Sequence, residues 1–365
     1  MSAGPSGDAW PRRIAVLCEV MHAPYDEGVR IYAASLATAM GQGREMLLLS
    51  ERNSTLGERT VEGLLTDRWF RSQALAKRLK EFAPDAVVYV PWTSLTPRTF
   101  ARLGALRRAA GAARFVAVAL QPRPAGWAAR VSLLLGRPDR VVTAGPGAAE
   151  QARALGLTAV EAGAGVDQNR FSPASPQERA RLRARAGLPP EAFVALHVGH
   201  LKESRNIAML EQVAAIGGVR CLLVASSSTG RDTETAARLS AAGVIVMTHH
   251  DDRIESVYRL ADVYLFPVVS ALDAIEAPLS VLEAAATDLP IVATRFGALP
   301  SMLQGGEDAK VTFVEDPRFI PDVVARLAAQ TGVGGGAGGT RRLVAGRTWQ
   351  RVADVVLKAL SQETS

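Results

Sequence analysis

The sequence predicts two doubly wound α/β domains, each built on a parallel β-sheet. The chain has 365 residues, which is more than one hydrophobic core usually organises and enough for two domains. Short apolar runs alternate with helix-compatible segments along most of its length, as they do in repeated βα units. A turn-rich stretch at residues 163–173, GAGVDQNRFSP, separates this alternation into two series.

The first series begins with a buried strand, IAVLCEV. Its strands are expected at Ile14–Val20, Met46–Ser50, Ala86–Val90, Phe115–Leu120 and Val141–Ala144, and its helices at about Val29–Gly41, Phe70–Phe82, Pro97–Ala110 and Gly147–Leu155. In such a sheet the functional loops leave the carboxyl ends of the strands. We therefore expect His22, Trp92, Thr93 and Gln121 around one crevice.

The second series follows a polar helix expected within Pro173–Pro190. Its strands are expected at Phe193–Val198, Val219–Ala225, Val244–Thr248, Asp262–Phe266, Ile291–Ala293 and Val311–Val314. The glycine-rich run Gly332–Gly339 predicts a flexible linker. The amphipathic spacing of Arg341–Leu360 predicts one last helix that packs on a domain.

These patterns divide the chain into four parts. Residues 1–11 are expected to form a disordered tail, residues 12–167 the first domain, residues 168–340 the second domain, and residues 341–365 a C-terminal helical segment.

Composition excludes several classes of protein. No run of about 18 apolar residues is present, so no transmembrane helix is expected. The start of the chain, MSAGPSGDAWPRR, lacks the apolar region of a secretory signal. Cys18 and Cys221 are the only cysteines, and each lies in a predicted buried strand. This indicates a reducing compartment without a disulfide framework, and we expect a cytoplasmic protein.

The most informative stretch is residues 275–300, IEAPLSVLEAAATDLPIVATRFGALP. Pro278 favours the start of a new helix directly after it. The first amides of that helix, those of Leu279, Ser280 and Val281, would form an anion site together with the helix dipole. Glu283, about one turn further, can reach a hydroxyl pair beside a bound phosphate. The alternative is an ordinary helix whose Glu283 is solvated.

This stretch resembles the C-terminal signature of the retaining glycosyltransferases of the GT4 class, the glycosyltransferase group 1 family. Their pattern is a Glu, a short turn, a helix with a second Glu, then Leu-Pro, an apolar strand and a Gly turn. In the family seven residues usually separate the two glutamates, whereas six separate Glu276 from Glu283. Ile275 therefore occupies the first-Glu position, and Glu276 is either a shifted substitute or a bystander. The resemblance implies the GT-B fold, with a crevice between two Rossmann-like domains.

A second part of the resemblance lies in the loop VGHLKESRNI, after the first strand of the second domain. Members of the family have Gly-Arg-Leu here, with a Lys five residues after the Arg. In this chain Gly199 keeps the glycine, His200 stands for the Arg, Arg205 stands for the Lys, and Lys202 adds a cation between them. The resemblance implies that these groups neutralise the diphosphate of the donor. His200 can do so as an imidazolium or as a neutral hydrogen-bond donor. The alternative is a solvated basic loop.

In the first domain the resemblance is weaker. Gly28 lies in the loop where relatives approach the donor, and its alternative role is to ease a tight turn. Gln121 replaces a His that relatives often have, and His22 is a candidate substitute that can equally be structural. The GVD…FSP segment from Gly165 to Pro173 resembles the end of the family's N-terminal domain. The family also sends its last helix back onto that domain.

The implied function is transfer of a sugar from a UDP- or GDP-linked donor to a small-molecule, glycan or lipid-linked acceptor, with retention at the anomeric carbon. The resemblance implies neither a metal nor a resident cofactor. Two alternatives stay open, because His200, Gln121 and Glu276 depart from the family pattern. They are a catalytically silent GT-B homologue that acts as a binding or scaffold partner, and a GT-B sugar-nucleotide epimerase.

Two further stretches have competing interpretations. His249–Asp252 could be mistaken for a metal cluster, but adjacent ligands rarely converge on one ion, and Asp251 or Asp252 fits better as a helix N-cap. Arginines concentrate between Arg98 and Arg140 with Asp139 as the only acid, and apolar residues interleave with them. This indicates either peripheral contact with the inner face of a membrane or a solvated basic surface. Base-stacking aromatic residues are too few for a nucleic-acid groove.

Overall fold

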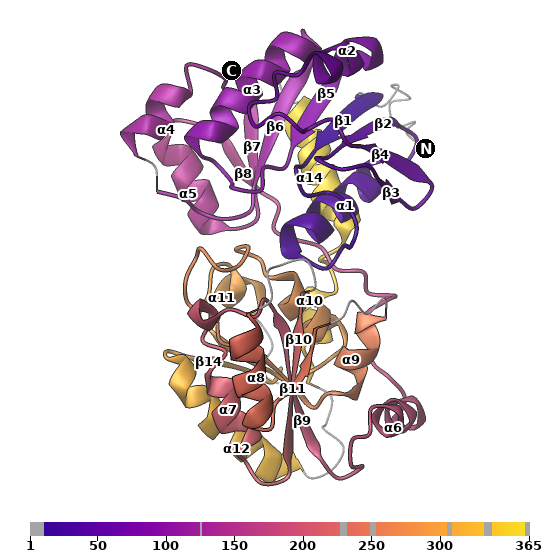
Figure 1. The fold of residues 1–365 in the computed structure, drawn as a ribbon, viewed down its shortest axis with the longest axis vertical. Coiled ribbons are helices and arrows are strands. Elements are labelled where there is room, and N and C mark those ends of the chain that lie inside the picture. Colours follow the sequence, from indigo (N-terminus) through magenta and orange to yellow (C-terminus); the bar gives the residue numbers. More distant parts are fainter. Residues whose placement is uncertain are drawn as a thin grey trace, which may run out of the picture. The chain divides into compact units, whose positions relative to one another are not determined.

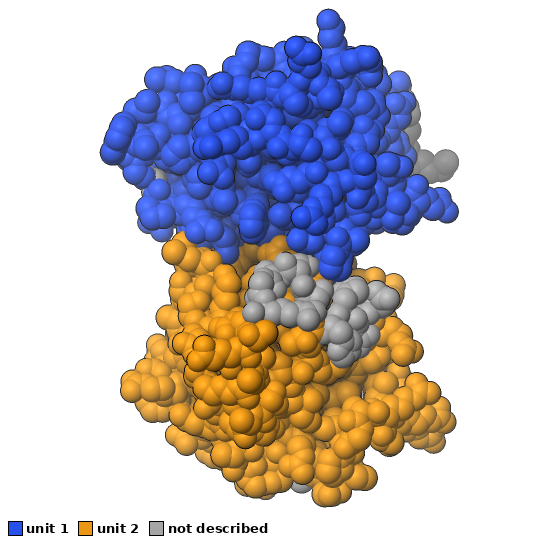
Figure 2. All heavy atoms as spheres, viewed as in Figure 1, with its two compact units in different colours: residues 1–25, 29–163, 350–365 blue, residues 26–28, 164–349 orange. Residues whose placement is uncertain are grey.

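The computed structural model describes residues 11–124, 126–226, 232–248, 253–304, 309–331 and 338–361. The chain divides into two compact units, shown in Figure 2. Unit 1 consists of residues 1–25, 29–163 and 350–365, and unit 2 of residues 26–28 and 164–349. The predicted N-terminal tail up to Trp10, the His249–Asp252 run and most of the glycine-rich linker lie outside the described residues.

Unit 1 is built on an eight-stranded sheet in the order β3-β4-β2-β1-β5-β6-β7-β8 (Figure 1). Its strands are β1 (Arg13–Leu17), β2 (Glu45–Leu49), β3 (Ser54–Leu56), β4 (Arg59–Glu62), β5 (Ala86–Tyr89), β6 (Arg114–Ala119), β7 (Arg140–Thr143) and β8 (Ala159–Glu161). Its helices are α1 (Gly28–Met40), α2 (Gln73–Phe82), α3 (Pro97–Ala110), α4 (Trp127–Ser132), α5 (Pro146–Ala154) and α14 (Trp349–Ser361). All neighbours pair in parallel except β3 and β4, a hairpin that the sequence analysis missed.

Unit 2 has a six-stranded, fully parallel sheet in the order β11-β10-β9-β12-β13-β14. Its strands are β9 (Phe193–Gly199), β10 (Val219–Ala225), β11 (Ile245–Met247), β12 (Val263–Phe266), β13 (Ile291–Thr294) and β14 (Val311–Val314). Its helical segments are α6 (Pro176–Arg185), η1 (Glu203–Arg205), α7 (Met209–Ala214), α8 (Thr233–Ala241), α9 (Ile254–Leu260), α10 (Leu279–Ala286), α11 (Leu299–Met302), η2 (Pro317–Phe319), α12 (Ile320–Thr331) and α13 (Arg341–Val344). The predicted fold class, two doubly wound parallel α/β sheets, is confirmed.

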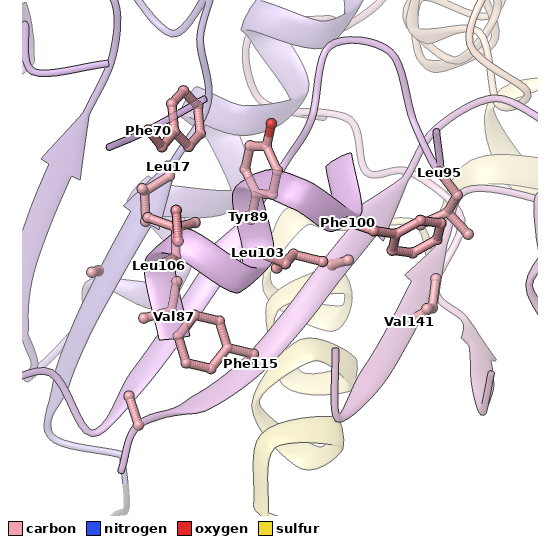
Figure 3. Packing of buried hydrophobic residues seen from close by; sticks show 14 of the residues in the cluster. Leu17, Phe70, Val87, Tyr89, Leu95, Phe100, Leu103, Leu106, Phe115 and Val141 are labelled. Carbon is pink, nitrogen blue, oxygen red and sulfur yellow. The ribbon is translucent and has the colours of Figure 1, made fainter. Parts of the chain in front are cut away.

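Alternate residues of each strand in unit 1 point to opposite faces of the sheet. Figure 3 shows Phe100, Leu103 and Leu106 of α3 packed over Val87 and Phe115 on one face. The last helix, α14, runs along the opposite face. This arrangement explains why the central strands are apolar at nearly every position, because both of their faces are covered.

The last helix differs from its prediction, since Arg341–Leu360 is not one continuous helix. It is interrupted between α13 and α14, at residues 345–348. The loop after Gly163 approaches this break so closely that a Cβ on Gly165 would lie 2.4 Å from the Trp349 nitrogen, and Val166 N donates to Arg347 O at 2.9 Å. The interruption coincides with the division between units, since α13 belongs to unit 2 and residues 350–361 belong to unit 1.

Two other helices differ from their predicted limits. Helix α2 begins at Gln73 and not at Phe70, because Phe70 has a left-handed φ of 58° and Ser72 caps the helix by accepting from Leu75 N. Helix α6, Pro176–Arg185, occupies the central part of the predicted Pro173–Pro190 segment. Its Arg179 and Arg183 side chains both pair with Asp262, next to the start of β12, which fixes the helix to unit 2.

Two expectations from composition can be compared with the structure. Cys18 and Cys221 are both buried and free, so no disulfide joins them. Among the described residues, no helix has the length and apolar character needed to cross a bilayer.

A buried ion pair holds together the carboxyl end of the first sheet. Glu19 follows β1 and pairs with Arg102 of α3, and both side chains are buried. The Glu19 carboxylate also accepts from the Tyr89 hydroxyl at 3.0 Å and from Trp92 N at 3.3 Å. Arg102 donates in addition to Arg68 O at 2.9 Å. Loops after β1 and β5 are thereby connected through one carboxylate.

Arg102→Met should therefore destabilise unit 1 by about 3–5 kcal/mol, because it leaves the buried Glu19 charge unpaired. The free energy of unfolding can be measured with urea by tryptophan fluorescence, since four of the five tryptophans precede residue 164. Adding Glu19→Gln should recover most of the loss. Arg78→Met is a matched control, because its pair with Glu62 is partly exposed and should be worth about 1 kcal/mol or less. Equal losses in Arg102→Met and Arg78→Met would contradict the prediction.

Candidate functional site

The carboxyl ends of β9 and β12 mark the point in unit 2 where the strand order reverses. From this central pair the chain continues to β10 and β11 on one side and to β13 and β14 on the other. In open α/β sheets ligands bind in the crevice outside such a point. The loop after β9 carries His200, Lys202 and Arg205, and the loop after β12 leads to α10. The predicted cations and the predicted helix start therefore belong to one edge of one sheet.

Arg205 is the most unusual side chain of this edge. It is buried, and its Nε and Nη1 atoms have no hydrogen-bond partner among the described residues. Burial lowers the pKa of its guanidinium, an effect that nearby Tyr264, Asp273 and Glu27 oppose. An arginine nevertheless keeps its charge in proteins. The site thus holds a buried cation with two donor atoms that lack acceptors among the described residues, which is costly unless an anion binds to it.

Gly199 leaves room beside this guanidinium. A Cβ at Gly199 would lie 2.5 Å from Arg205 Nη1 and 3.0 Å from His197 Nε2. The first distance is shorter than a Cβ contact allows and the second is unusually tight, so a larger residue would displace the Arg205 guanidinium. The glycine predicted to bind the donor is therefore the one that keeps the space next to Arg205 open.

His197 is a site residue that the sequence analysis missed. It is fully buried in β9, and its Nδ1 lies 2.9 Å from Leu265 O. Its Nε2 has no partner within the described part of the chain. The available signal was a single polar residue in an otherwise apolar strand, FVALHVG, two positions before the glycine.

Both histidines of this edge are neutral near pH 7. Burial, together with Arg205, lowers the pKa of His197 to about 4. Burial, with Arg205 and Lys202, lowers the pKa of His200 to about 4 as well. The neutral His197 ring can therefore donate from Nδ1 to Leu265 O and keep a lone pair on Nε2. Of the two forms expected for His200, these surroundings favour the neutral hydrogen-bond donor, and the fixed positive charges are Arg205 and the exposed Lys202.

Helix α10 begins at Leu279, directly after Pro278 as predicted, and no side chain of the described residues caps it. The amide of Val281 already donates to Pro278 O at 3.2 Å. An incoming anion would therefore meet the amides of Leu279 and Ser280 first. The Ser280 side chain hydrogen-bonds to Tyr264, whose hydroxyl also donates to Val198 O at 3.3 Å. Tyr264 thus connects the start of α10 to the end of β9.

Glu283 lies one turn into α10 and is held by Tyr258 of α9. The Tyr258 hydroxyl donates to Glu283 Oε2 at 2.7 Å. Burial raises the pKa of Glu283, and the hydrogen bond from Tyr258 partly offsets this. The Tyr258 ring in turn packs edge-on against Phe171, with ring centroids 5.6 Å apart. The position of the Glu283 carboxylate is thus set by side chains of two other segments.

Backbone contacts join Glu276 to the turn after β13. Glu276 is buried, and its carbonyl oxygen accepts from Ala298 N at 2.9 Å. Gly297 has a left-handed φ of 50°, and a Cβ there would lie 2.5 Å from Glu276 O. The turn after β13 therefore requires glycine. Ile275, at the position where relatives have glutamate, packs near Gly28, from which a Cβ would be 3.6 Å away.

The remaining predicted residues, Gln121, His22 and Gly28, precede residue 164 in the chain. Gln121 is buried at the end of β6, and its Oε1 accepts from Arg123 Nη2 at 2.9 Å. His22 is buried after β1, where its Nδ1 lies 3.1 Å from Ala23 O. Both lie beyond the carboxyl ends of their strands, as expected. Gly28 opens α1 and groups with unit 2.

The described residues contain no group of three His, Cys, Asp or Glu side chains able to hold a metal ion. The His249–Asp252 run, including the predicted N-cap, is not among them. Helix α9, which follows this run, begins at Ile254.

Comparison with known protein families identifies the central part of unit 2. Residues 192–330 match the family model of the glycosyl transferases group 1. Unit 2 therefore contains a glycosyl transferases group 1 domain. The resemblance noted in the sequence is confirmed for this domain, which includes His197, Gly199, Arg205, Glu276 and Glu283.

Two curated relatives of this chain are transferases by name. The sulfoquinovosyl transferase SQD2 of Arabidopsis thaliana is 27% identical over 164 residues, which cover 45% of this chain and 31% of that protein. A D-inositol 3-phosphate glycosyltransferase of Arthrobacter sp. (strain FB24) is 29% identical over 208 residues, covering 53% and 48%. The chain thus matches less than half the length of each relative.

Solved structures show the fold of the whole chain. The structure of Anabaena Alr3699/HepE in complex with UDP and glucose has a TM-score of 0.73 and 14% sequence identity, and the match covers 96% of this chain and 100% of that one. A glycosyltransferase from Rickettsia africae ESF-5 also gives a TM-score of 0.73, with 12% identity over 95% and 97% of the chains. The chain has the GT-B fold, as the resemblance implied.

The buried His197 leads to a prediction about stability and pH. Its pKa is about 4 in the folded protein and about 6.5 in an unfolded chain. Between these values the unfolded state binds more protons, so the stabilisation is complete above pH 6.5 and is lost as the pH falls toward 4. His197→Asn, which keeps a donor for Leu265 O, should reduce the loss of unfolding free energy between pH 7 and pH 5 by about 2 kcal/mol. Urea unfolding followed by circular dichroism at both pH values measures it. An unchanged pH dependence would rule out His197 as the titrating group.

Proposed function

We propose that this protein is a retaining glycosyltransferase that moves a hexose-type sugar from a nucleotide-sugar to an acceptor hydroxyl. The observation that carries the proposal is the buried Arg205 guanidinium, whose Nε and Nη1 have no described partner, at the strand-order reversal of the group 1 domain. A diphosphate is the dianionic group that would satisfy these donors. HepE, which has the same fold, was solved with UDP-glucose. UDP-sugars are therefore the first donors to test, and GDP-sugars the second.

The chain's residues would divide the binding of the donor between them. Arg205, supported by Lys202, would bind the diphosphate, and His200 would add a neutral hydrogen bond. The amides of Leu279 and Ser280 would meet a phosphate oxygen at the positive end of α10. Glu283, held by Tyr258, would accept hydrogen bonds from the ribose hydroxyls. Gly28 and Gln121 remain the candidates for contacts on the sugar side, and Glu276 for a contact near the reacting carbon.

In the proposed reaction, the acceptor oxygen forms a bond to the anomeric carbon while the bond from that carbon to the phosphate oxygen breaks. The electron pair leaves with the nucleotide diphosphate, and the acceptor proton passes to the leaving phosphate on the same face of the sugar. Charge grows on the diphosphate as the bond breaks, so a fixed cation such as Arg205 stabilises the transition state more than the ground state. We propose that these side-chain cations make a resident metal or cofactor unnecessary, and unchanged turnover in excess chelator is the corresponding test.

The general test is release of nucleotide diphosphate. Thermal-shift screening against UDP- and GDP-sugars selects the donor, and release of the diphosphate is then measured with small-molecule, glycan and lipid-linked acceptors. Donor binding without release or transfer would identify a catalytically silent protein, and inversion of the sugar within the donor would identify an epimerase.

Arg205→Met should lower turnover by about a hundredfold or more, because it removes an electrostatic stabiliser of the leaving group. The same change should leave the free energy of unfolding unchanged or raise it, because it removes a buried charge without a described partner. Turnover and urea unfolding of the same variant measure both effects. Lys202→Met is the matched control, since Lys202 is exposed, and its turnover should fall less. A severe loss in Lys202→Met with a mild loss in Arg205→Met would contradict the assignment.

Glu283→Gln should weaken binding of the nucleotide diphosphate about tenfold or more, because a charged acceptor of two hydroxyl groups is worth about 1.5–3 kcal/mol. Titration calorimetry with the nucleotide diphosphate and with inorganic pyrophosphate measures the effect. Pyrophosphate has no ribose, so its affinity should not change. Equal weakening of both ligands would show that Glu283 acts through the fold of α10 and not through the ribose.

A further inference from the structure

Unit 1 carries a concentrated apolar surface that the proposed reaction does not use. We call it the α4 patch, and it consists of Trp127, Val131, Leu134 and Leu135. Their exposed fractions are 79%, 55%, 87% and 57%. Nine large hydrophobic residues are exposed among those that the structure describes, and four of them fall in this nine-residue stretch. Their spacing of four, three and one residues places them along one side of a helix and its following turn.

The segment is inside-out relative to an ordinary surface helix. The residues that it buries are the small Ala129, Ser132 and Gly136. Four of its five large apolar residues are exposed, and the fifth, Leu133, is partly buried against the core. A surface helix normally turns its large apolar side chains to the core. A contiguous apolar surface of this kind usually marks an interaction site.

Close packing prevents this segment from turning over. A Cβ on Gly104 of α3 would lie 1.9 Å from Leu135 O, and a Cβ on Gly136 would lie 2.1 Å from Gly104 N. The two backbones are therefore in direct contact. The outward direction of the apolar side chains is consequently a property of the fold.

The surroundings of the α4 patch are basic. Arg130 and Arg137 belong to the same segment and are exposed. Arg130 donates to Ala154 O, next to the exposed Arg153, and Arg107 donates to Arg137 O, next to the exposed Arg108. The acids nearby are Asp139, which pairs with Arg107 at 2.6 Å, and the exposed Glu150 of α5.

We propose that the α4 patch docks this protein on the surface of an anionic membrane. Trp127 and the two leucines would enter the boundary between headgroups and acyl chains, where an indole ring is favoured. The surrounding arginines would lie at the headgroups and bind their phosphates, with their apolar stems covering the edge of the patch.

A second copy of this chain is a less suitable occupant. In a symmetric dimer the same patch meets itself, so the arginines of the two copies would face one another. The surrounding acids are too few to pair with them. An anionic lipid surface instead complements both the apolar and the basic parts of the patch.

Vesicle co-sedimentation of the full-length protein tests the proposal without any donor or acceptor. Wild type should bind vesicles of equal parts phosphatidylglycerol and phosphatidylcholine, bind pure phosphatidylcholine at least tenfold more weakly, and dissociate as salt is raised. Trp127→Ser combined with Leu134→Ser should weaken binding to the anionic vesicles at least tenfold. Phe319→Ser, which changes a residue of unit 2 exposed by 55%, is the matched control and should bind like wild type.

Arg130→Gln combined with Arg137→Gln should remove the preference for anionic vesicles, whereas Arg318→Gln in unit 2 should not. Urea unfolding of the Trp127 and Leu134 variant, followed by circular dichroism, reports on its fold independently of membranes. Three outcomes would overturn the proposal: no binding of wild type to anionic vesicles, equal binding by the patch variant, or a wild-type dimer in sedimentation equilibrium that the patch variant abolishes.

Discussion

The candidate site depends on one topological constraint, the reversal of strand order between β9 and β12. All six strands of unit 2 are parallel, so every carboxyl end lies at the same edge of the sheet. Only at the reversal do two neighbouring strands send their following segments in opposite directions, which leaves a space that no connection fills. Gly199 keeps that space open on the β9 side, and α10 presents its first amides on the β12 side.

The basic side chains at this edge of the sheet differ in charge although they lie close together. The same burial that makes His197 and His200 neutral leaves Arg205 charged, because a guanidinium does not release its proton in proteins. Binding sites often retain such unfavourable groups, since replacing them would stabilise the fold at the expense of function. Two tyrosine hydroxyl groups connect the elements of this edge. Tyr264 hydrogen-bonds to β9 and α10, and Tyr258 of α9 hydrogen-bonds to α10.

Much of the fold was predictable from the sequence, because strands covered on both faces are apolar at successive positions. Strand β10 and helix α3 were predicted with their observed limits, and α10 was predicted to start where it does because Pro278 marks that point. The charged residues after β9 were also predicted as a group. Two features were not predicted, because the residues next to them in the sequence give no signal for them. The β3–β4 hairpin is short and half exposed. The interruption before Trp349 lies where the backbone of Gly165, 184 residues earlier in the chain, comes close to it.

Side-chain environment was the least predictable property. His197 has no sequence signal beyond being polar within a strand, and its depressed pKa comes from burial beside Arg205. The orientation of α4 could not be predicted from the sequence either, because periodicity shows only that apolar residues share a face. Which face turns inward is decided by the contact between Gly104 and Gly136.

The discontinuity of unit 1 has a consequence for biosynthesis. Helix α14 covers one face of its sheet, and Arg114 Nη1 donates to Leu360 O at 3.0 Å, yet the ribosome makes that helix only after all of unit 2. A nascent chain that has just finished β8 therefore carries a sheet on which the part of one apolar face that α14 covers is still uncovered. Unit 2, whose segments from residue 164 to 349 are contiguous, can complete its core during synthesis. Maturation of the first unit is thereby delayed until the second has emerged, and chaperone binding to nascent chains should concentrate on this uncovered face.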